Sequence, residues 1–216
     1  FLLAIFGVYS AALAGAALAV RRGFGLWGRL AMPVLTAMGG GTLRDLLVGG
    51  ERMPFYFLRD LTYPTGILVT VLLLSAVVAW RPRVVQTRAF DVLLEATDVV
   101  GYAFLAVFGA SVAIQAELPW VWAPLCGALT CTGGGLLRRV LFEPGQTQEL
   151  RAHFYEHAAL LGGLSLFLGL RLANRWEYTG APVQWSLAIS VLLVIALQIV
   201  ARLPKRPAAS RPPERA

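Results

Sequence analysis

The sequence predicts an all-α membrane protein of seven transmembrane helices, arranged as a three-plus-three inverted repeat with one extra helix. Three observations support this fold class: charged residues are few, they are separated by long uncharged runs, and the first half of the chain is echoed in the second. Of the 216 residues, 57% are hydrophobic and only 14% are charged, whereas an average soluble domain carries about 25% charged residues. So few charges cannot cover a soluble domain of this size, which argues against a soluble enzyme or a nucleic-acid-binding module.

The uncharged runs place the helices. A bilayer core needs about 20 mostly apolar residues per helix, and the runs therefore predict spans at 1–20, 27–49, 62–80, 92–115, 120–142, 155–173 and 183–203. The second and sixth spans must include residues beyond a flanking charge, because their uncharged runs are too short alone. Arginine and lysine gather on the cytoplasmic side of membrane proteins. Here 14 of the 19 lie in the loops after the first, third and fifth spans and in the tail, which predicts a cytoplasmic C-terminus and an external N-terminus.

An internal repeat divides the chain. A shift of 94 residues places small residues and a glycine triplet of the first half on those of the second: Gly7 on Gly101, Gly15 on Gly109, Gly39–Gly41 on Gly133–Gly135, and Arg44 on Arg138. Because each copy holds three spans, the second copy must enter the membrane from the opposite side. We therefore expect a first repeat at 1–88, an inverted second repeat at 89–176, a seventh helix at 177–203 and a basic disordered tail at 204–216.

The two glycine triplets lie inside predicted spans. Each glycine costs about 1 kcal/mol of helix stability relative to alanine, and irregular backbone at membrane depth is tolerated only where it faces protein or a water-filled cavity. Inverted repeats with interrupted helices are typical of transporters, in which the interruptions mark the pathway. The triplets thus predict glycine-broken second and fifth helices beside a pathway. Close helix packing is the alternative role of small residues, and we favour it for Gly7, Gly15, Gly101 and Gly109.

Ionisable residues follow both triplets. Arg44 and Asp45 follow the first, Arg138 and Arg139 follow the second, and Asp98 lies early in the fourth span. Charges at membrane depth are costly and commonly functional. A structural ion pair between crossing helices, such as Arg138 with Asp98, is the other explanation.

The twin Gly-Gly-Gly-x-x-Arg segments and the three-plus-three-plus-one layout resemble the prokaryotic trimeric intracellular cation (TRIC) channel family over about residues 1–203. The resemblance implies a prokaryotic inner (plasma) membrane protein that forms a homotrimer. Each subunit would conduct monovalent cations, chiefly potassium, through its own pore between the kinked second and fifth helices. Two positions depart from the family: Arg139 stands where Asp is usual, and Ala4 where Asp is frequent.

The repeat and the resemblance together give the expected ion pathway, with transient cation contacts at the two triplets: Thr36, Gly39, Gly40, Gly41, Arg44, Asp45, Asp98, Thr130, Gly133, Gly134, Gly135 and Arg138. Membrane lipids and two further copies of the chain are the expected partners, and we expect no catalysis, resident metal, cofactor or nucleic acid. A carrier for a small solute, such as glycine or another small amino acid, is the alternative. A membrane enzyme using His153, Glu156 and His157 is disfavoured, because no third metal ligand is evident.

Overall fold

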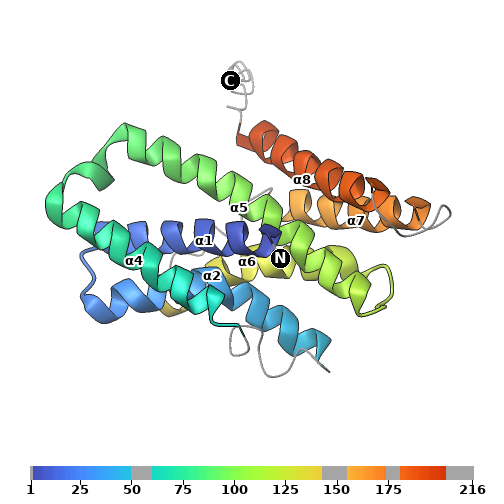
Figure 1. Cartoon of the computed structure of the whole chain (residues 1–216), viewed down its shortest axis with the longest axis horizontal. Coiled ribbons are helices and arrows are strands. Elements are labelled where there is room, and N and C mark those ends of the chain that lie inside the picture. Colours follow the sequence, from blue (N-terminus) through green and yellow to red (C-terminus); the bar gives the residue numbers. More distant parts are fainter. Residues whose placement is uncertain (1, 50–59, 143–154, 174–180, 203–216) are drawn as a thin grey trace, which may run out of the picture.

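The computed structural model describes residues 2–49, 60–142, 155–173 and 181–202. Within these ranges the chain is helical, without strands (Figure 1). The seven predicted helices are confirmed, with these bounds: α1 Leu2–Arg21, α2 Leu26–Val48, α4 Thr62–Trp80, α5 Arg88–Gln115, α6 Trp122–Phe142, α7 Tyr155–Ala173 and α8 Ala181–Arg202, with a short 3-10 turn, η2, at Val84–Gln86. The tail predicted at 204–216 lies outside the described residues.

The largest difference in helix bounds is at the start of α5, which begins at Arg88 rather than at residue 92. Thr87 caps this end, because its hydroxyl oxygen accepts a hydrogen bond from the backbone N–H of Phe90 at 3.3 Å. Such a cap satisfies one of the otherwise unpaired N–H groups of the first turn.

Apolar side chains lie on the outside of this helical bundle. Among the described helices, α1, α4, α5 and the Val183–Arg202 part of α8 are long and apolar enough to cross a membrane, and α7 contains a shorter apolar stretch. Large apolar side chains such as Leu73 of α4 and Leu192 of α8 are more than 60% exposed. So many exposed large apolar side chains are typical of surfaces that contact lipid or other subunits.

The helices pack in two groups of three. α1, α2 and α4 contact one another, as do α5, α6 and α7, while α8 packs on α7 and α5. Contacts of α1 with α5 and of α2 with α6 join the two groups. Figure 1 shows α7 and α8 side by side along one end of α5. The grouping agrees with the predicted repeats, whose inversion stays a prediction.

Matched contacts follow the 94-residue shift. A Cβ atom added at Gly15 would lie 2.9 Å from the hydroxyl oxygen of Thr36, and one added at Gly109 would lie 2.3 Å from that of Thr130. α1 therefore packs on α2 through the same residue types as α5 on α6. Close packing is the role that the sequence favoured for these two glycines, and the structure supports it.

The helical backbone continues through both triplets. α2 includes Gly39–Gly41 and α6 includes Gly133–Gly135 without a break. The prediction of broken helices is corrected here: the backbone keeps its helical hydrogen bonds, and a bend in either helix stays a prediction. The glycines serve a different need, the close approach of one helix to the other.

Candidate functional site

α2 and α6 cross backbone to backbone at their glycine triplets. A Cβ atom on Gly40 would lie 2.1 Å from the carbonyl oxygen of Thr130, and one on Gly134 would lie 2.1 Å from that of Thr36. Real Cβ atoms essentially never come within 3.0 Å of another heavy atom, so only glycine fits at either position. The two contacts are again related by the 94-residue shift. The crossing leaves no room for an ion between the helices in this conformation.

The other triplet glycines fall into two environments. A Cβ atom on Gly39 would lie 3.2 Å from the Cα of Gly134, and one on Gly133 would lie 2.9 Å from the Cα of Gly40, so both belong to the crossing. Gly41 is buried in α2. Gly135 differs from the rest, because no atom lies within 4 Å of its added Cβ. The second triplet therefore ends at an open space.

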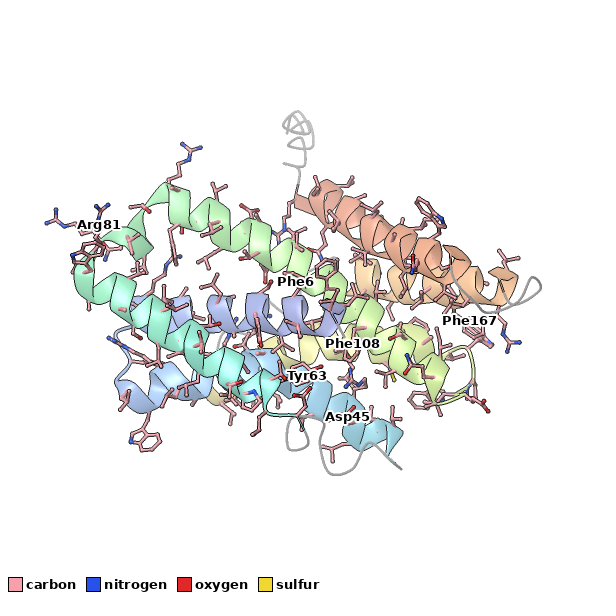
Figure 2. The ribbon with its side chains drawn as sticks, in the orientation of Figure 1. Phe6, Asp45, Tyr63, Arg81, Phe108 and Phe167 are labelled. Atoms are coloured by element: carbon pink, nitrogen blue, oxygen red, sulfur yellow. The ribbon has the colours of Figure 1, made fainter. Side chains whose placement is uncertain are left out.

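A buried ion pair lies just after the crossing on α2. Arg44 and Asp45 are 1% and 0% exposed, and the Nε and Nη2 atoms of Arg44 donate to Oδ1 of Asp45 at 2.9 and 2.7 Å. Nη1 also donates across the crossing to the hydroxyl of Thr130 on α6 at 3.4 Å. The guanidinium carbon lies 5.2 Å from the ring centre of Phe108 on α5, and Figure 2 shows Phe108 and Asp45 in the same part of the molecule.

The pair is electrically neutral but incompletely hydrogen-bonded. Oδ2 of Asp45 is buried and has no hydrogen-bond partner among the residues that the structure describes. A buried carboxylate oxygen without a partner costs stability, and here the charge of Arg44 offsets part of that cost. The buried pair of Arg44 and Asp45 thus leaves one atom, Oδ2 of Asp45, that can accept a further hydrogen bond.

A cavity of about 580 Å³ lies on the other side of the crossing. α2 contributes Thr36 to its lining, and α6 contributes residues from Thr132 to Arg139, including Gly135 and Arg138. α1, α5 and α8 complete the wall. The lining is rich in polar side chains: Arg21, Thr36, Glu95, Asp98, Tyr102, Thr132, Arg138, Arg139, Gln198 and Arg202. Four arginines and two carboxylates face this space, so positive charge exceeds negative charge by two.

The carboxylates of the cavity share one arginine. Arg202, the last residue of α8, donates through Nη1 to Oε1 of Glu95 and through Nη2 to Oδ2 of Asp98, each at 3.1 Å. The side chain of Arg202 is 19% exposed, whereas those of Glu95 and Asp98 are 62% and 55% exposed. The sequence suggested Arg138 as a partner for Asp98, and the structure gives Asp98 this other partner.

The predicted pathway residues thus fall in three adjacent places. Thr36, Asp98, Gly135 and Arg138 line the cavity; Gly39, Gly40, Gly133 and Gly134 lie in the crossing, with Gly41 buried next to them in α2; and Arg44, Asp45 and Thr130 form the buried cluster. For the enzyme hypothesis, His153 and the side chain of Glu156 lie outside the described residues. Within the described part of the chain, no group of three or more His, Cys, Asp and Glu residues could hold a metal ion.

Comparison with known proteins identifies the family. The model of a family described as "Glycine transporter" matches residues 1–80 and 95–171. The chain belongs to this family. Two curated relatives are a UPF0126 membrane protein of Deinococcus radiodurans, 32% identical over 200 residues (83% of this chain, 89% of the relative), and the UPF0126 inner membrane protein YadS of Escherichia coli K12, 32% identical over 162 residues (74% of this chain, 73% of the relative).

Solved structures of TRIC channels share the fold of this family member. A structure described as showing the basis for conductance through TRIC cation channels is 26% identical, covers 97% of this chain and 98% of its own, and superposes with a TM-score of 0.77. The TRIC channel orthologue of Rhodobacter sphaeroides is 27% identical, with a TM-score of 0.74 and coverages of 92% and 94%. The resemblance to prokaryotic TRIC channels is confirmed. This family member is a multi-pass membrane protein, and its relatives are channels and membrane proteins, not enzymes.

The two positions at which the resemblance implies a departure, Ala4 and Arg139, differ in their surroundings. Ala4 lies on α1 and is fully buried in the core that α1 forms with the neighbouring helices. An unpaired carboxylate would be costly there. Arg139 lines the cavity and adds one positive charge to its lining.

Sequence reasoning missed the contribution of α8 to this site. Gln198 is fully buried, lines the cavity, and has no hydrogen-bond partner for either side-chain amide atom within the described residues. Arg202 lies four residues further on the same helix. A glutamine deep in an uncharged span is the signal that the sequence carries for this role, although α8 also contains Gln184 near its start and has no counterpart in the repeat.

Proposed function

We propose that this protein is a homotrimeric potassium channel of the prokaryotic inner membrane, with a separate pathway through each subunit between α2 and α6. The observation that supports it is the likeness, over nearly the whole chain, to solved TRIC cation channels. That likeness supports a cation channel. The trimer, the preference for potassium, and the external N-terminus and cytoplasmic C-terminus are our further proposals.

The proposed pathway runs from the cavity through the glycine crossing to the buried ion pair. The cavity lies at the ends of α1 and α8 that carry Arg21 and Arg202. Basic helix ends favour the cytoplasmic side, so we place the cavity there and the Arg44–Asp45 pair toward the outside. Conduction then requires α2 and α6 to separate at Gly40 and further conformational change around Arg44.

Oxygen atoms along this route would replace part of the hydration shell of a cation, as channel filters do. The hydroxyls of Thr36 and Thr130, the carbonyls of the two triplets and Oδ2 of Asp45 are the proposed contacts. Potassium is the permeant ion rather than a resident cofactor. Asp45 matters most in this proposal, because Oδ2 has no hydrogen-bond partner in the described part of the chain and carries the negative charge that a cation needs beside Arg44.

A planar bilayer containing the purified protein tests the proposal. Under a potassium gradient we expect unitary currents that reverse near the potassium equilibrium potential. Currents that reverse near the chloride equilibrium potential would overturn it, as would the absence of current in bilayers where a control channel conducts. The mass of the detergent-purified protein, corrected for bound detergent, is expected to equal three chains.

A carrier for a zwitterionic amino acid is the second candidate. The cavity presents arginines and carboxylates together, which would pair with the carboxylate and ammonium groups of a small amino acid, and the matching family model carries the description "Glycine transporter". Inverted repeats serve carriers. Saturable uptake of labelled glycine into vesicles, without unitary currents, would favour this function over the channel.

A further inference from the structure

We propose that α8 forms one wall of the cytoplasmic mouth of the pathway, and that Arg202 sets how strongly this mouth attracts cations. The inference rests on the proposed channel function and extends it to a helix outside the repeat. α8 also lies outside the segments 1–80 and 95–171 that the family model matches. Neither the repeat nor the family match therefore suggests a role for it.

The placement of two side chains supports the first half of the proposal. Gln198 and Arg202 are four residues apart, so they share one face of α8, and both line the cavity. Gln198 is 0% exposed, with its amide oxygen and nitrogen both lacking a hydrogen-bond partner within the described residues. Leaving a buried amide without partners is costly, and water or a permeating ion in the cavity can supply them. Ile199, by contrast, is 52% exposed on the outside of the bundle.

The two ion pairs of Arg202 support the second part of the proposal, that Arg202 sets how strongly the mouth attracts cations. Glu95 and Asp98 are three residues apart on α5, which places them on one face of that helix, and Arg202 holds both at 3.1 Å. One positive charge thus masks two neighbouring carboxylates at the mouth. Removing it frees both carboxylates and lowers the positive excess of the lining from two charges to one.

Coulomb's law gives the size of the effect. A unit charge about 10 Å from an ion in a water-like medium changes the local cation concentration about twofold. The Debye length is about 30 Å at 0.01 M salt and about 3 Å at 1 M salt. We therefore expect Arg202→Gln to raise the unitary potassium conductance about twofold in 10 mM KCl and to leave it unchanged in 1 M KCl.

Single-channel recording of Arg202→Gln, Arg202→Lys and Arg81→Gln tests this expectation. Arg81 is exposed at the end of α4, on the same predicted side of the membrane, and Figure 2 shows it far from α8. Arg81→Gln removes the same charge from the protein and should not raise the conductance. Arg202→Lys keeps the charge and should lack the rise in 10 mM KCl.

The possible results separate this inference from the channel proposal. A wild-type protein without cation current overturns the channel proposal itself. A conducting wild type with equal conductances for Arg202→Gln and Arg81→Gln in 10 mM KCl overturns the role of Arg202. A rise that persists in 1 M KCl also overturns it, because a change in pore structure, and not in charge, would then be responsible.

Thiol modification tests independently whether α8 forms a wall of the cytoplasmic mouth. In a Cys126→Ala, Cys131→Ala background, Gln198→Cys is expected to react with a positively charged methanethiosulfonate reagent added from the cytoplasmic side, and the current should fall. Ile199→Cys is the matched control on the neighbouring position and should keep its current. If the reagent leaves the current of Gln198→Cys unchanged, or lowers both currents equally, α8 does not line the mouth.

Discussion

The Gly40→Ala substitution tests how closely the backbones of α2 and α6 approach each other. The Cβ of Gly40→Ala would lie 2.1 Å from the carbonyl oxygen of Thr130, and 3.4 Å is the lower end of ordinary van der Waals contact. The helices must therefore separate locally by about 1.3 Å, because neither backbone can rotate away as a side chain can. Overpacking costs about 1–3 kcal/mol, and we take the upper end, about 3 kcal/mol, for a backbone clash. The better helix propensity of alanine returns about 1 kcal/mol, which leaves a net loss of about 2 kcal/mol.

Gly135→Ala is the matched control for this prediction. It makes the same change in the second triplet, one residue after the Gly134 that matches Gly40 in the repeat, and no atom lies within 4 Å of the added Cβ there. It should keep the propensity gain and stabilise the protein by about 1 kcal/mol. The free energy of unfolding in mixed detergent micelles, followed by tryptophan fluorescence, compares the two variants. Equal free energies for Gly40→Ala and the wild type, or an equal loss for Gly135→Ala, would refute the close backbone crossing.

Three further predictions concern packing and charge elsewhere in the chain. Arg44→Met should cost about 3–5 kcal/mol of unfolding free energy by leaving Asp45 buried without its partner, and the cost should shrink in an Asp45→Asn background; independent, additive effects would contradict the pair. Gly66→Ala should cost about 1–3 kcal/mol, because its Cβ would meet the Tyr9 ring at 2.1 Å, and a Tyr9→Ala background should relieve this cost. The carboxyl group of Asp60 accepts hydrogen bonds from the side chain and from the backbone N–H of Thr62 at the start of α4, and these lower its pKa. Its contribution to stability is present above the ordinary Asp pKa and is lost as the pH falls through the lowered folded-state pKa, so Asp60→Asn should flatten the acid side of the stability profile.

The sequence predicted the helices well because their signal is local. Long uncharged runs need no tertiary information, since a helix that crosses a bilayer must satisfy its own backbone. The start of α5 was missed by one turn, because the cap at Thr87 precedes the apolar run. The triplets were located correctly, but their role depended on what lies opposite each glycine. Gly40 and Gly134 face carbonyl oxygens of the crossing helix, whereas Gly135 faces open space.

Composition and the 94-residue repeat thus determined the helical class, the number of helices and the positions of α2 and α6 in the chain, because hydrophobicity and small-residue patterns are properties of the chain itself. Only the tertiary structure decided which charges meet. Arg202 contacts Glu95 and Asp98, which lie more than 100 positions away in the sequence. Gln198, on the same helix outside the repeat, lines the same cavity. Such contacts depend on helix packing in three dimensions, which spacing along one chain does not encode. The sequence therefore predicts that the positive excess of the whole chain reflects topology, whereas the charge of the cavity emerges only from the tertiary structure.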